Sequence, residues 1–264
     1  MKKIVMLTAA LGLSLSPAAF ATSSYAPDAS DTESDAAHQL HNSIGLAAVY
    51  QENIYAGVDN EVKPFPLLNL TYGDFFIKGT TLGYNTYKTD VMEVAIIGRP
   101  SFQGYNADDS AELNGMNSTG ALVNVGGQVI FKVRPLVTTV SAVHDFSGNT
   151  SGNTLGLKVA AGVPLMDRQF VLIPSVAFTY QDSNIINYYY GVDHSEATQT
   201  RPEYSPSNTI NTTLGLTARY QVSQHWAATA AYMLTKYGDE VSDSPIVDRA
   251  TSSTVLLGMS YLFS

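Results

Sequence analysis

The chain has 264 residues, no cysteine and a formal net charge of −9 at pH 7. The lack of cysteine excludes disulfides, thiolate metal sites and cysteine nucleophiles, and the negative charge argues against nucleic acid as a partner. Hydrophobic residues make up 45% of the chain, but they lie in short alternating pieces. No stretch beyond the N-terminal one approaches the roughly 18 apolar residues of a membrane-spanning helix, so a membrane form would have to cross as strands.

The first 21 residues have the pattern of a secretory signal peptide. Lys2 and Lys3 form a positive region, a mostly apolar stretch runs from Ile4 to Leu15, and Ala19-Phe20-Ala21 provides a small-x-small cleavage site. We expect cleavage after Ala21. Loss of the two lysines then takes the formal charge from −9 to −11.

Residues Thr22 to His41 are rich in Ser, Asp and Ala and contain few large apolar side chains. This composition predicts a disordered lead segment, which is either a passive tether or a binding tail. His38 and His41 lie in it without a third metal ligand nearby, so we predict no metal site there. No phosphate-loop or dinucleotide motif is present, and we expect no cofactor.

Residues 42–264 are predicted to form one all-β domain, because turn-forming residues separate short alternating segments throughout. The predicted strands are Ser43–Gln51, Phe65–Tyr72, Phe75–Tyr84, Asp90–Arg99, Gly120–Arg134, Leu136–Phe146, Thr154–Val163, Phe170–Gln181, Thr209–Tyr220, His225–Tyr237 and Thr251–Phe263. No amphipathic helix of useful length is predicted.

The last predicted strand, Thr251–Phe263, indicates what kind of sheet this is. Read with a period of two, one face carries Val255, Leu257, Met259, Tyr261 and Phe263, and the other is smaller and more polar. This pattern is typical of a membrane β-barrel wall, with lipid outside and a wetter lumen inside. Bacterial barrels have an even strand number, so we predict an antiparallel transmembrane β-barrel of about 12 strands, with 10 as the alternative. The uncounted strand would be Ile185–Tyr190, or one segment has been divided wrongly.

Three long connections, Ser101–Thr119, Asp182–Asn208 and Gly238–Ala250, are predicted to lie together on the outer side of the membrane. Their acidic residues predict either a cation- or surface-binding rim or ordinary solvated loops. These residues are Asp108, Asp109, Glu112, Asp193, Glu196, Glu203, Asp239, Glu240, Asp243 and Asp248.

Charged residues within the strands are candidates for the lumen. Lys78, Glu93 and Arg99 are the first candidates for a selectivity ring, although such residues also anchor at the interface or pair across the lumen. Other candidates are Lys132, Arg134, Lys158, Arg219 and Lys236.

The most unusual local feature is a tyrosine cluster, Tyr188, Tyr189 and Tyr190 with Tyr204. It predicts either a binding platform for a sugar or peptide, or a folded-in loop that plugs the lumen or lies in an interfacial girdle.

Two sequence patterns resemble catalytic groups. His144-Asp145 lies near a strand end, where adjacent side chains point to opposite faces, and Asp193-His194-Ser195 is adjacent in sequence only. We therefore predict no catalytic residue and no enzymatic activity.

Several short motifs resemble those of the MipA/OmpV outer-membrane proteins, in the order expected for that family. They are Tyr55-Ala56-Gly57-Val58-Asp59 with Pro64 and Pro66, Tyr72-Gly73-Asp74-Phe75-Phe76, Gly98-Arg99, Asp145-Phe146-Ser147-Gly148, Tyr188-Tyr189-Tyr190-Gly191-Val192, Ser195-Glu196-Ala197, Tyr204-Ser205-Pro206, Ser223-Gln224-His225-Trp226, Asp243-Ser244-Pro245-Ile246-Val247 and the closing Tyr261 and Phe263. Two departures are visible: Val58 replaces the usual serine, and Ser264 follows the terminal aromatic residue.

The resemblance implies a location in the outer-membrane lipid and a non-enzymatic scaffold that tethers a murein lytic transglycosylase and a penicillin-binding murein synthase. It also implies that Tyr261 and Phe263 form the signal for the barrel-assembly machinery, with Phe263 acting from the penultimate position. Two alternatives remain open, namely a pore for small solutes and a surface adhesin or stress-responsive coat protein that acts through the acidic loops.

Overall fold

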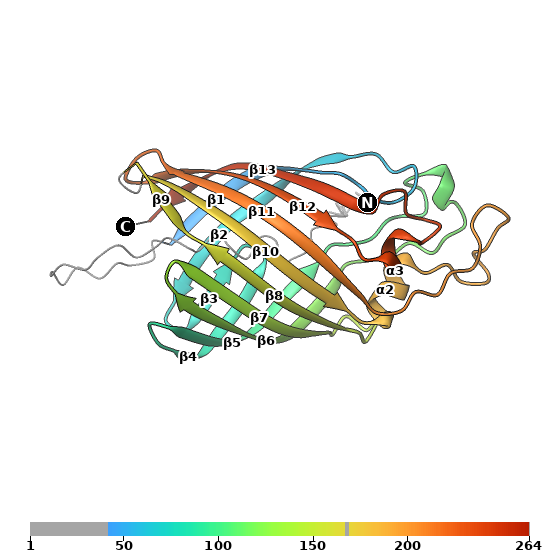
Figure 1. Ribbon diagram of the computed structural model, residues 1–264, viewed down its shortest axis with the longest axis horizontal. Helices are drawn as coiled ribbons and strands as arrows, with labels where there is room; N and C mark the ends of the chain where they lie inside the picture. Colours follow the sequence, from blue (N-terminus) through green and yellow to red (C-terminus); the bar gives the residue numbers. More distant parts are fainter. Residues whose placement is uncertain (1–41, 167–168, 264) are drawn as a thin grey trace, which may run out of the picture.

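The computed structural model describes residues 42–166 and 169–263, and these form one closed antiparallel β-barrel with loops gathered at one end (Figure 1). The predicted signal peptide (1–21) and lead segment (22–41) lie outside the described residues. The strands are β1 (Ser43–Gln51), β2 (Glu61–Tyr72), β3 (Phe75–Lys78), β4 (Thr81–Lys88), β5 (Met92–Ser101), β6 (Leu122–Val133), β7 (Leu136–Asp145), β8 (Asn153–Ala161), β9 (Val163–Leu165), β10 (Phe170–Gln181), β11 (Thr209–Gln221), β12 (Trp226–Lys236) and β13 (Thr251–Leu262).

The wall has twelve strands, because β8 and β9 are two pieces of one strand. Both pair with β10, and the chain between them is interrupted only at Gly162. Every other strand pairs with its sequence neighbours, and β1 closes the barrel by pairing with β13 from Ser43↔Leu262 to Gln51↔Thr254. The predicted fold class and strand number are thus confirmed.

The strand missing from the sequence-based count arises because one predicted strand is in fact a hairpin of two strands. The predicted strand Phe75–Tyr84 is divided by a turn at Gly79 and Thr80 into β3 and the first half of β4. Gly79 adopts a positive φ of 59°, which glycine tolerates and which allows so tight a turn.

The alternative site for the missing strand, Ile185–Tyr190, was wrong, because these residues belong to helix α2 (Ser183–Tyr190). The prediction of no useful helix is corrected as well. The carboxylate of Asp182 caps α2 by accepting a hydrogen bond from the Ile185 amide at 3.2 Å. None of the described helices is long and apolar enough to cross a membrane.

The alternation of side chains follows the predicted period of two. In β13, Ser252, Thr254 and Leu256 are buried inside the barrel, whereas Leu257 and Met259 are exposed on its outer face. The outer face of the other strands is likewise rich in exposed Leu, Ile, Val and Tyr side chains, as expected for a surface that contacts lipid.

The two ends of the barrel differ. Ser43 and Leu262 lie at one end, which we call the turn end, together with short turns such as Gly73-Asp74 and Arg134-Pro135. The three long connections all emerge at the opposite end, which we call the loop end (Figure 1). The predicted grouping of the long loops is therefore confirmed.

In one section of the wall the strands do not reach as far toward the loop end as their neighbours do. The β3–β4 hairpin pairs with β2 only over Asn69–Tyr72 and with β5 only up to Gly98, so the loop-end portions of β2 and β5 have no strand between them. We call the region between residues 61–68 of β2 and residues 99–101 of β5 the wall break.

Three prolines lie on the open edges of the wall break. The Leu68 carbonyl oxygen accepts a hydrogen bond from the Gly79 amide, and alternate residues of a strand share an edge, so Pro64 and Pro66 face the break. By the same alternation Pro100 of β5 faces away from β6, whose Lys132 amide donates to Val91. Proline has no N–H, so these edges carry fewer unpaired donors.

Two glycines of adjacent strands provide a test of wall packing. A Cβ atom on Gly126 in β6 would lie 2.0 Å from the carbonyl oxygen of Ala142, whereas nothing lies within 4 Å of the equivalent position on Gly98 in β5. We expect Gly126→Ala to destabilise the barrel by about 1–3 kcal/mol and Gly98→Ala to change stability by less than about 0.5 kcal/mol. Urea unfolding midpoints in lipid vesicles measure both, and equal midpoints for the two variants would contradict this packing.

Candidate functional site

The loop end is closed by a folded assembly that we call the cap, made of residues 52–60, 102–121, 182–208 and 237–250 (Figure 1). It contains α2, the short 3-10 helix Ala111–Leu113 and helix α3 (Asp239–Ser242). Backbone pairing joins the segments at two bridges, Tyr55↔Val247 and Val192↔Tyr204. The long connections are therefore one packed structure rather than separate loops.

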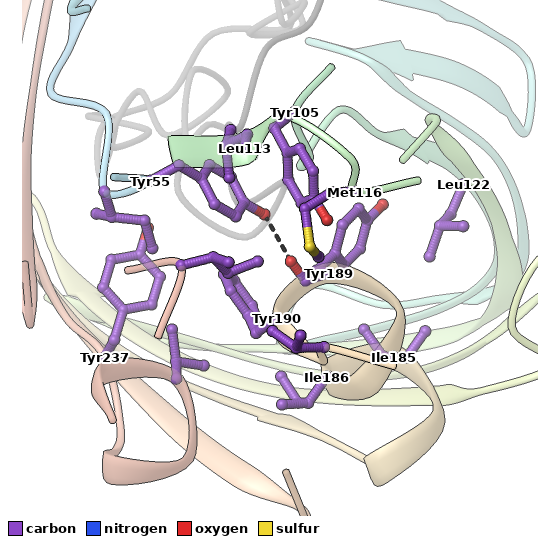
Figure 2. Close-up of a cluster of buried hydrophobic side chains, with 14 residues drawn as sticks. Tyr55, Tyr105, Leu113, Met116, Leu122, Ile185, Ile186, Tyr189, Tyr190 and Tyr237 are labelled. Atoms are coloured by element: carbon purple, nitrogen blue, oxygen red, sulfur yellow. Dashed lines mark hydrogen bonds between the residues drawn. The ribbon is translucent and has the colours of Figure 1, made fainter. Parts of the chain in front are cut away.

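The cap has its own hydrophobic core, which is drawn in Figure 2. All four segments contribute to it, together with Leu122 at the start of β6. Its buried members are Ile54, Tyr55, Tyr105, Leu113, Met116, Leu122, Ile185, Ile186, Tyr189, Tyr190, Val192, Tyr237, Val241 and Ile246.

Helix α2 supplies the centre of this core. Ile185, Ile186, Tyr189 and Tyr190 follow an i, i+1, i+4, i+5 spacing, which places them on one side of a helix, and all four are at most 2% exposed. The Tyr55 ring lies 5.7 Å from that of Tyr190. Side chains from distant parts of the sequence thus converge on a single helix (Figure 2).

The tyrosine hydroxyls of the core are used as hydrogen-bond donors. Tyr55 donates to the Tyr189 carbonyl at 3.2 Å, and Tyr189 donates to the Gly120 carbonyl at 3.3 Å. Burial raises the pKa of Tyr55, Tyr189 and Tyr190, and it raises the pKa of Tyr237 to about 12. These hydroxyls therefore stay protonated and able to donate at neutral pH.

A buried arginine holds two cap segments together. The Arg201 guanidinium donates to the Glu112 carbonyl at 2.5 Å, to the Asn114 carbonyl at 3.1 Å and to the Glu196 carbonyl at 2.8 Å. The Glu196 carboxylate in turn accepts from the amide and the side chain of Asn117, both at 2.7 Å. Arg201 and Glu196 thus link residues 182–208 to residues 102–121 from both sides.

Sequence reasoning did not identify Arg201, and it placed Glu196 among the rim acids. Several of the other predicted rim acids also have structural hydrogen bonds. Glu240 accepts from the Ser207 amide at 2.7 Å, Asp248 from Gly57 at 3.2 Å and Asp109 from Asn106 at 2.7 Å. The Ser207 hydrogen bonds lower the pKa of Glu240. Part of the acidic rim therefore organises the cap itself.

The predicted tyrosine cluster is brought together in the cap. Tyr189 and Tyr190 are buried in its core, Tyr188 packs partly buried beside them, and its hydroxyl accepts a hydrogen bond from the Gly120 amide at 2.7 Å. Tyr204 donates to the Glu240 carbonyl at 3.1 Å. Three of the four hydroxyls, those of Tyr188, Tyr189 and Tyr204, are thus committed to contacts within the cap.

Six of the predicted lumen charges face the interior of the barrel, namely Lys78, Glu93, Arg99, Lys132, Lys158 and Arg219. The other two do not, because Lys236 lies on the outer face of β12 and Arg134 lies in the turn between β6 and β7. Glu93 is 4% exposed and forms an ion pair with Lys132 at 2.5 Å, and Lys78 lies close enough to influence both charges. Arg99 is 6% exposed and lies nearer the loop end of the same strand as Glu93. The structure therefore places Lys78 and Glu93 in one charged group and Arg99 apart from it.

The histidine-containing patterns are not assembled into a catalytic group. His144 lies 3.1 Å from the Asn153 side chain, while Asp145 accepts hydrogen bonds from Ser147 and Thr150. His194 is exposed and lies 3.1 Å from Glu203. Within the described residues, no group of three or more His, Asp or Glu side chains is arranged to hold a metal ion.

The predicted assembly signal lies at the turn end on the outer face. The Tyr261 ring contacts those of Phe263, Trp226 and His225, with centroid distances of 5.4, 5.3 and 5.7 Å. An aromatic group at this height is the expected girdle between lipid and water.

A closed barrel with an apolar outer face, an aromatic girdle and a capped lumen defines the class as a β-barrel of the bacterial outer membrane. A sequence model described as "MltA-interacting protein MipA" matches residues 44–263. The chain belongs to this family.

Three relatives support the same location. The chain is 27% identical over 225 residues to the putative outer membrane protein YiaT of Escherichia coli K12, covering 84% of this chain and 90% of YiaT. It is 26% identical over 201 residues to the outer membrane protein OmpV of Vibrio cholerae, covering 75% and 77%. It is 25% identical over 231 residues to the MltA-interacting protein of Escherichia coli K12, covering 84% and 90%. The protein is located in the outer membrane.

Removal of the Arg201 side chain should loosen the cap and spare the wall. Arg201→Ala leaves the carbonyls of Glu112, Asn114 and Glu196 without their charged donor, which should destabilise the cap by about 2–4 kcal/mol. Hydrogen exchange of cap amides, followed by mass spectrometry, should rise while strand amides stay protected. Arg249→Ala is the matched control, because Arg249 is 53% exposed and its carboxylate partner lies 3.9 Å away. Equal exchange in both variants would contradict this role.

Cap stability should decrease at alkaline pH. Tyr237 has a pKa of about 12 in the folded cap and about 10 when unfolded, so its contribution is complete below pH 10 and is lost as the pH rises toward 12. Urea unfolding followed by near-ultraviolet circular dichroism should show a falling midpoint from pH 9.5 to 11.5. Tyr237→Phe should have a flatter profile, and an unchanged slope would contradict the assignment.

Proposed function

We propose that this protein is a non-enzymatic outer-membrane scaffold that holds a murein lytic transglycosylase and a penicillin-binding murein synthase near the peptidoglycan. The observation that carries the proposal is the cap. Its continuous apolar core, with four segments tied by buried hydrogen bonds, fills the loop end of the barrel. A closed barrel of this kind is better suited to present a surface than to conduct solutes.

Family membership supports the partner class. One relative, with 84% of this chain matched, is named MltA-interacting protein. The resemblance described above implies that the attached enzymes perform the chemistry while the barrel positions them. The scattered His and Asp residues, which form no catalytic group in the described part of the chain, are consistent with such a role.

The turn end is the surface we propose for docking. In outer-membrane barrels the short turns face the periplasm, where the peptidoglycan lies. This end carries unusually exposed apolar side chains, with Tyr72 88%, Met166 76% and Phe75 63% exposed. Exposed apolar groups of this kind mark contact surfaces for proteins or for the membrane interface. Residues 22–41 join the chain at the same end and form a second candidate contact.

A binding measurement tests the scaffold. The full barrel in nanodiscs is immobilised, and a purified lytic transglycosylase is passed over it by biolayer interferometry. We expect saturable binding that the double substitution Tyr72→Ser with Met166→Ser weakens about tenfold, which corresponds to loss of about 1.4 kcal/mol of contact energy.

Val62→Ser is the matched control, because Val62 is 66% exposed at the loop end and should not touch a periplasmic partner. Deletion of residues 22–41 separates the contribution of the lead segment from that of the turns. The proposal would be refuted by wild-type protein that shows no saturable binding, or by equal losses in the turn-end and loop-end variants.

A pore for small solutes is the second candidate function, and the inward-facing Lys78, Glu93 and Arg99 favour it. Planar bilayer recordings distinguish the two functions. The scaffold predicts no channel steps from a barrel whose folding is verified by heat-modifiable migration on a gel. Reproducible steps would instead favour the pore and make these three residues the first to substitute.

A further inference from the structure

The wall break lies beside an arginine that has no partner among the described residues. Arg99 is the first residue of β5 beyond the last β4–β5 pair, Leu82↔Gly98, and Pro100 beside it lies on the open edge. Because neighbouring residues of a strand point to opposite faces, Arg99 faces the lumen while Gly98 and Pro100 face the lipid. The guanidinium therefore lies on the lumen side of the wall, at the point where β4 no longer pairs with β5.

Among the described residues, Arg99 has no partner for its charge. Its side chain is 6% exposed, yet none of the hydrogen bonds or ion pairs within the described residues involves it. The nearest carboxylate along the register, Asp145, is occupied by Ser147 and Thr150, each of which donates through its amide and its hydroxyl. Buried charges in proteins are almost always paired, so a buried guanidinium without a partner among the described residues is suited to bind an anion.

A second polar group at this position also lacks a partner. Asn124 lies opposite Arg99 in the β5–β6 register and is 4% exposed, and its Oδ1 atom is buried without any hydrogen bond. An unsatisfied buried acceptor in a native structure calls for an explanation. Together Asn124 and Arg99 provide an acceptor and up to five donors. A phosphate head group that keeps one proton suits both residues, whereas a carboxylate would pair with Arg99 alone.

The surroundings of the break are apolar. On the lumen side Phe65 and Leu67 of β2 pack in one cluster with Ala47, Val49 and Leu256, and Phe102 packs against it from the cap. On the lipid side Pro64 and Pro66 are exposed, and nothing lies within 4 Å of a Cβ position on Gly98. An alkyl chain would meet apolar side chains and proline rings along this edge, together with the backbone carbonyl oxygens that the prolines leave there.

We propose that the wall break binds an amphiphilic anion, a phosphate or carboxylate head on an alkyl chain. The head pairs with Arg99 inside the barrel, and the chain passes between β2 and β5 into the lipid. A free anion would have no use for the apolar edge of the break, which favours a ligand with an alkyl chain. A neutral lipid would not neutralise Arg99, which favours a ligand with a charged head group. The site is independent of the scaffold function, because it lies at the loop end of the wall rather than on the turns.

Calorimetric titration of the full barrel in zwitterionic lipid nanodiscs tests the proposal. The probes are dodecyl phosphate, dodecanoate, dodecanol and inorganic phosphate, with empty nanodiscs subtracted. We expect saturable binding of the first two probes at one per barrel and no saturable binding of dodecanol. Arg99→Gln should weaken dodecyl phosphate at least about tenfold, as expected for loss of a charged hydrogen bond, and Arg99→Lys should weaken it less.

Two further variants make the result specific. Arg219→Gln removes another inward-facing, partly buried arginine, on β11, and should bind dodecyl phosphate like the wild type. Gly98→Phe keeps Arg99 and places a ring on the lipid side of the break, so it should weaken dodecyl phosphate but not inorganic phosphate. It also tests the site if the Arg99 variants fail to fold.

Three results would overturn the proposal. Dodecanol binding as tightly as dodecyl phosphate would show that the head group is irrelevant. Inorganic phosphate binding as tightly as dodecyl phosphate would show a free-ion site in the lumen, with no role for the break. An equal loss in Arg219→Gln and Arg99→Gln would show a general effect of luminal charge.

Discussion

The structure depends on one constraint, that backbone polar groups in a hydrocarbon environment must hydrogen-bond within the protein. The closed β1–β13 and β10–β11 pairings satisfy it around the wall. The wall break is the exception, and Pro64, Pro66 and Pro100 remove donors from its edges. Their carbonyl oxygens remain, so this stretch of edge has to meet polar atoms. The break therefore belongs near the membrane surface, which agrees with its place beside the cap.

The cap is the second feature that needs a physical explanation, because it is built from the long segments that connect the strands of the wall. Its segments are long, and ordering them costs conformational entropy that isolated solvated loops would not repay. The residues that offset this cost come from segments far apart in sequence, such as Tyr55, Tyr105 and Tyr189. Arg201 adds charged hydrogen bonds to the carbonyls of Glu112 and Asn114 in another cap segment. The cap is thus an ordered structure at the loop end, while the turn end stays available for the proposed docking.

The sequence predicted the wall well because a period of two is imposed on each strand by lipid outside and polar groups inside. Two of the predicted strands, Ser43–Gln51 and Phe170–Gln181, have the observed bounds. The β3–β4 turn escaped detection because Gly79-Thr80 is only two residues long and lies within a segment that otherwise reads as one continuous strand. Helix α2 escaped detection because three consecutive tyrosines favour a strand locally, while Asp182 as cap and burial against the other cap segments favour the helix.

Composition alone could not reveal the candidate sites, because it does not say which face of a strand each charge lies on. A formal charge of −9 describes the sum over the chain, whereas alternation along the strands sorts charges between two faces. Among the described strand residues, the inward-facing cations are Lys63, Lys78, Lys88, Arg99, Lys132, Lys158 and Arg219.

The acids sorted to the same interior are fewer. Glu93 is paired with Lys132, Asp145 is held by its own loop, and Glu61 lies half-exposed beside Lys63 at the rim. An acidic protein thus encloses a basic interior, and this separation is what makes an anion at Arg99 a physically reasonable ligand.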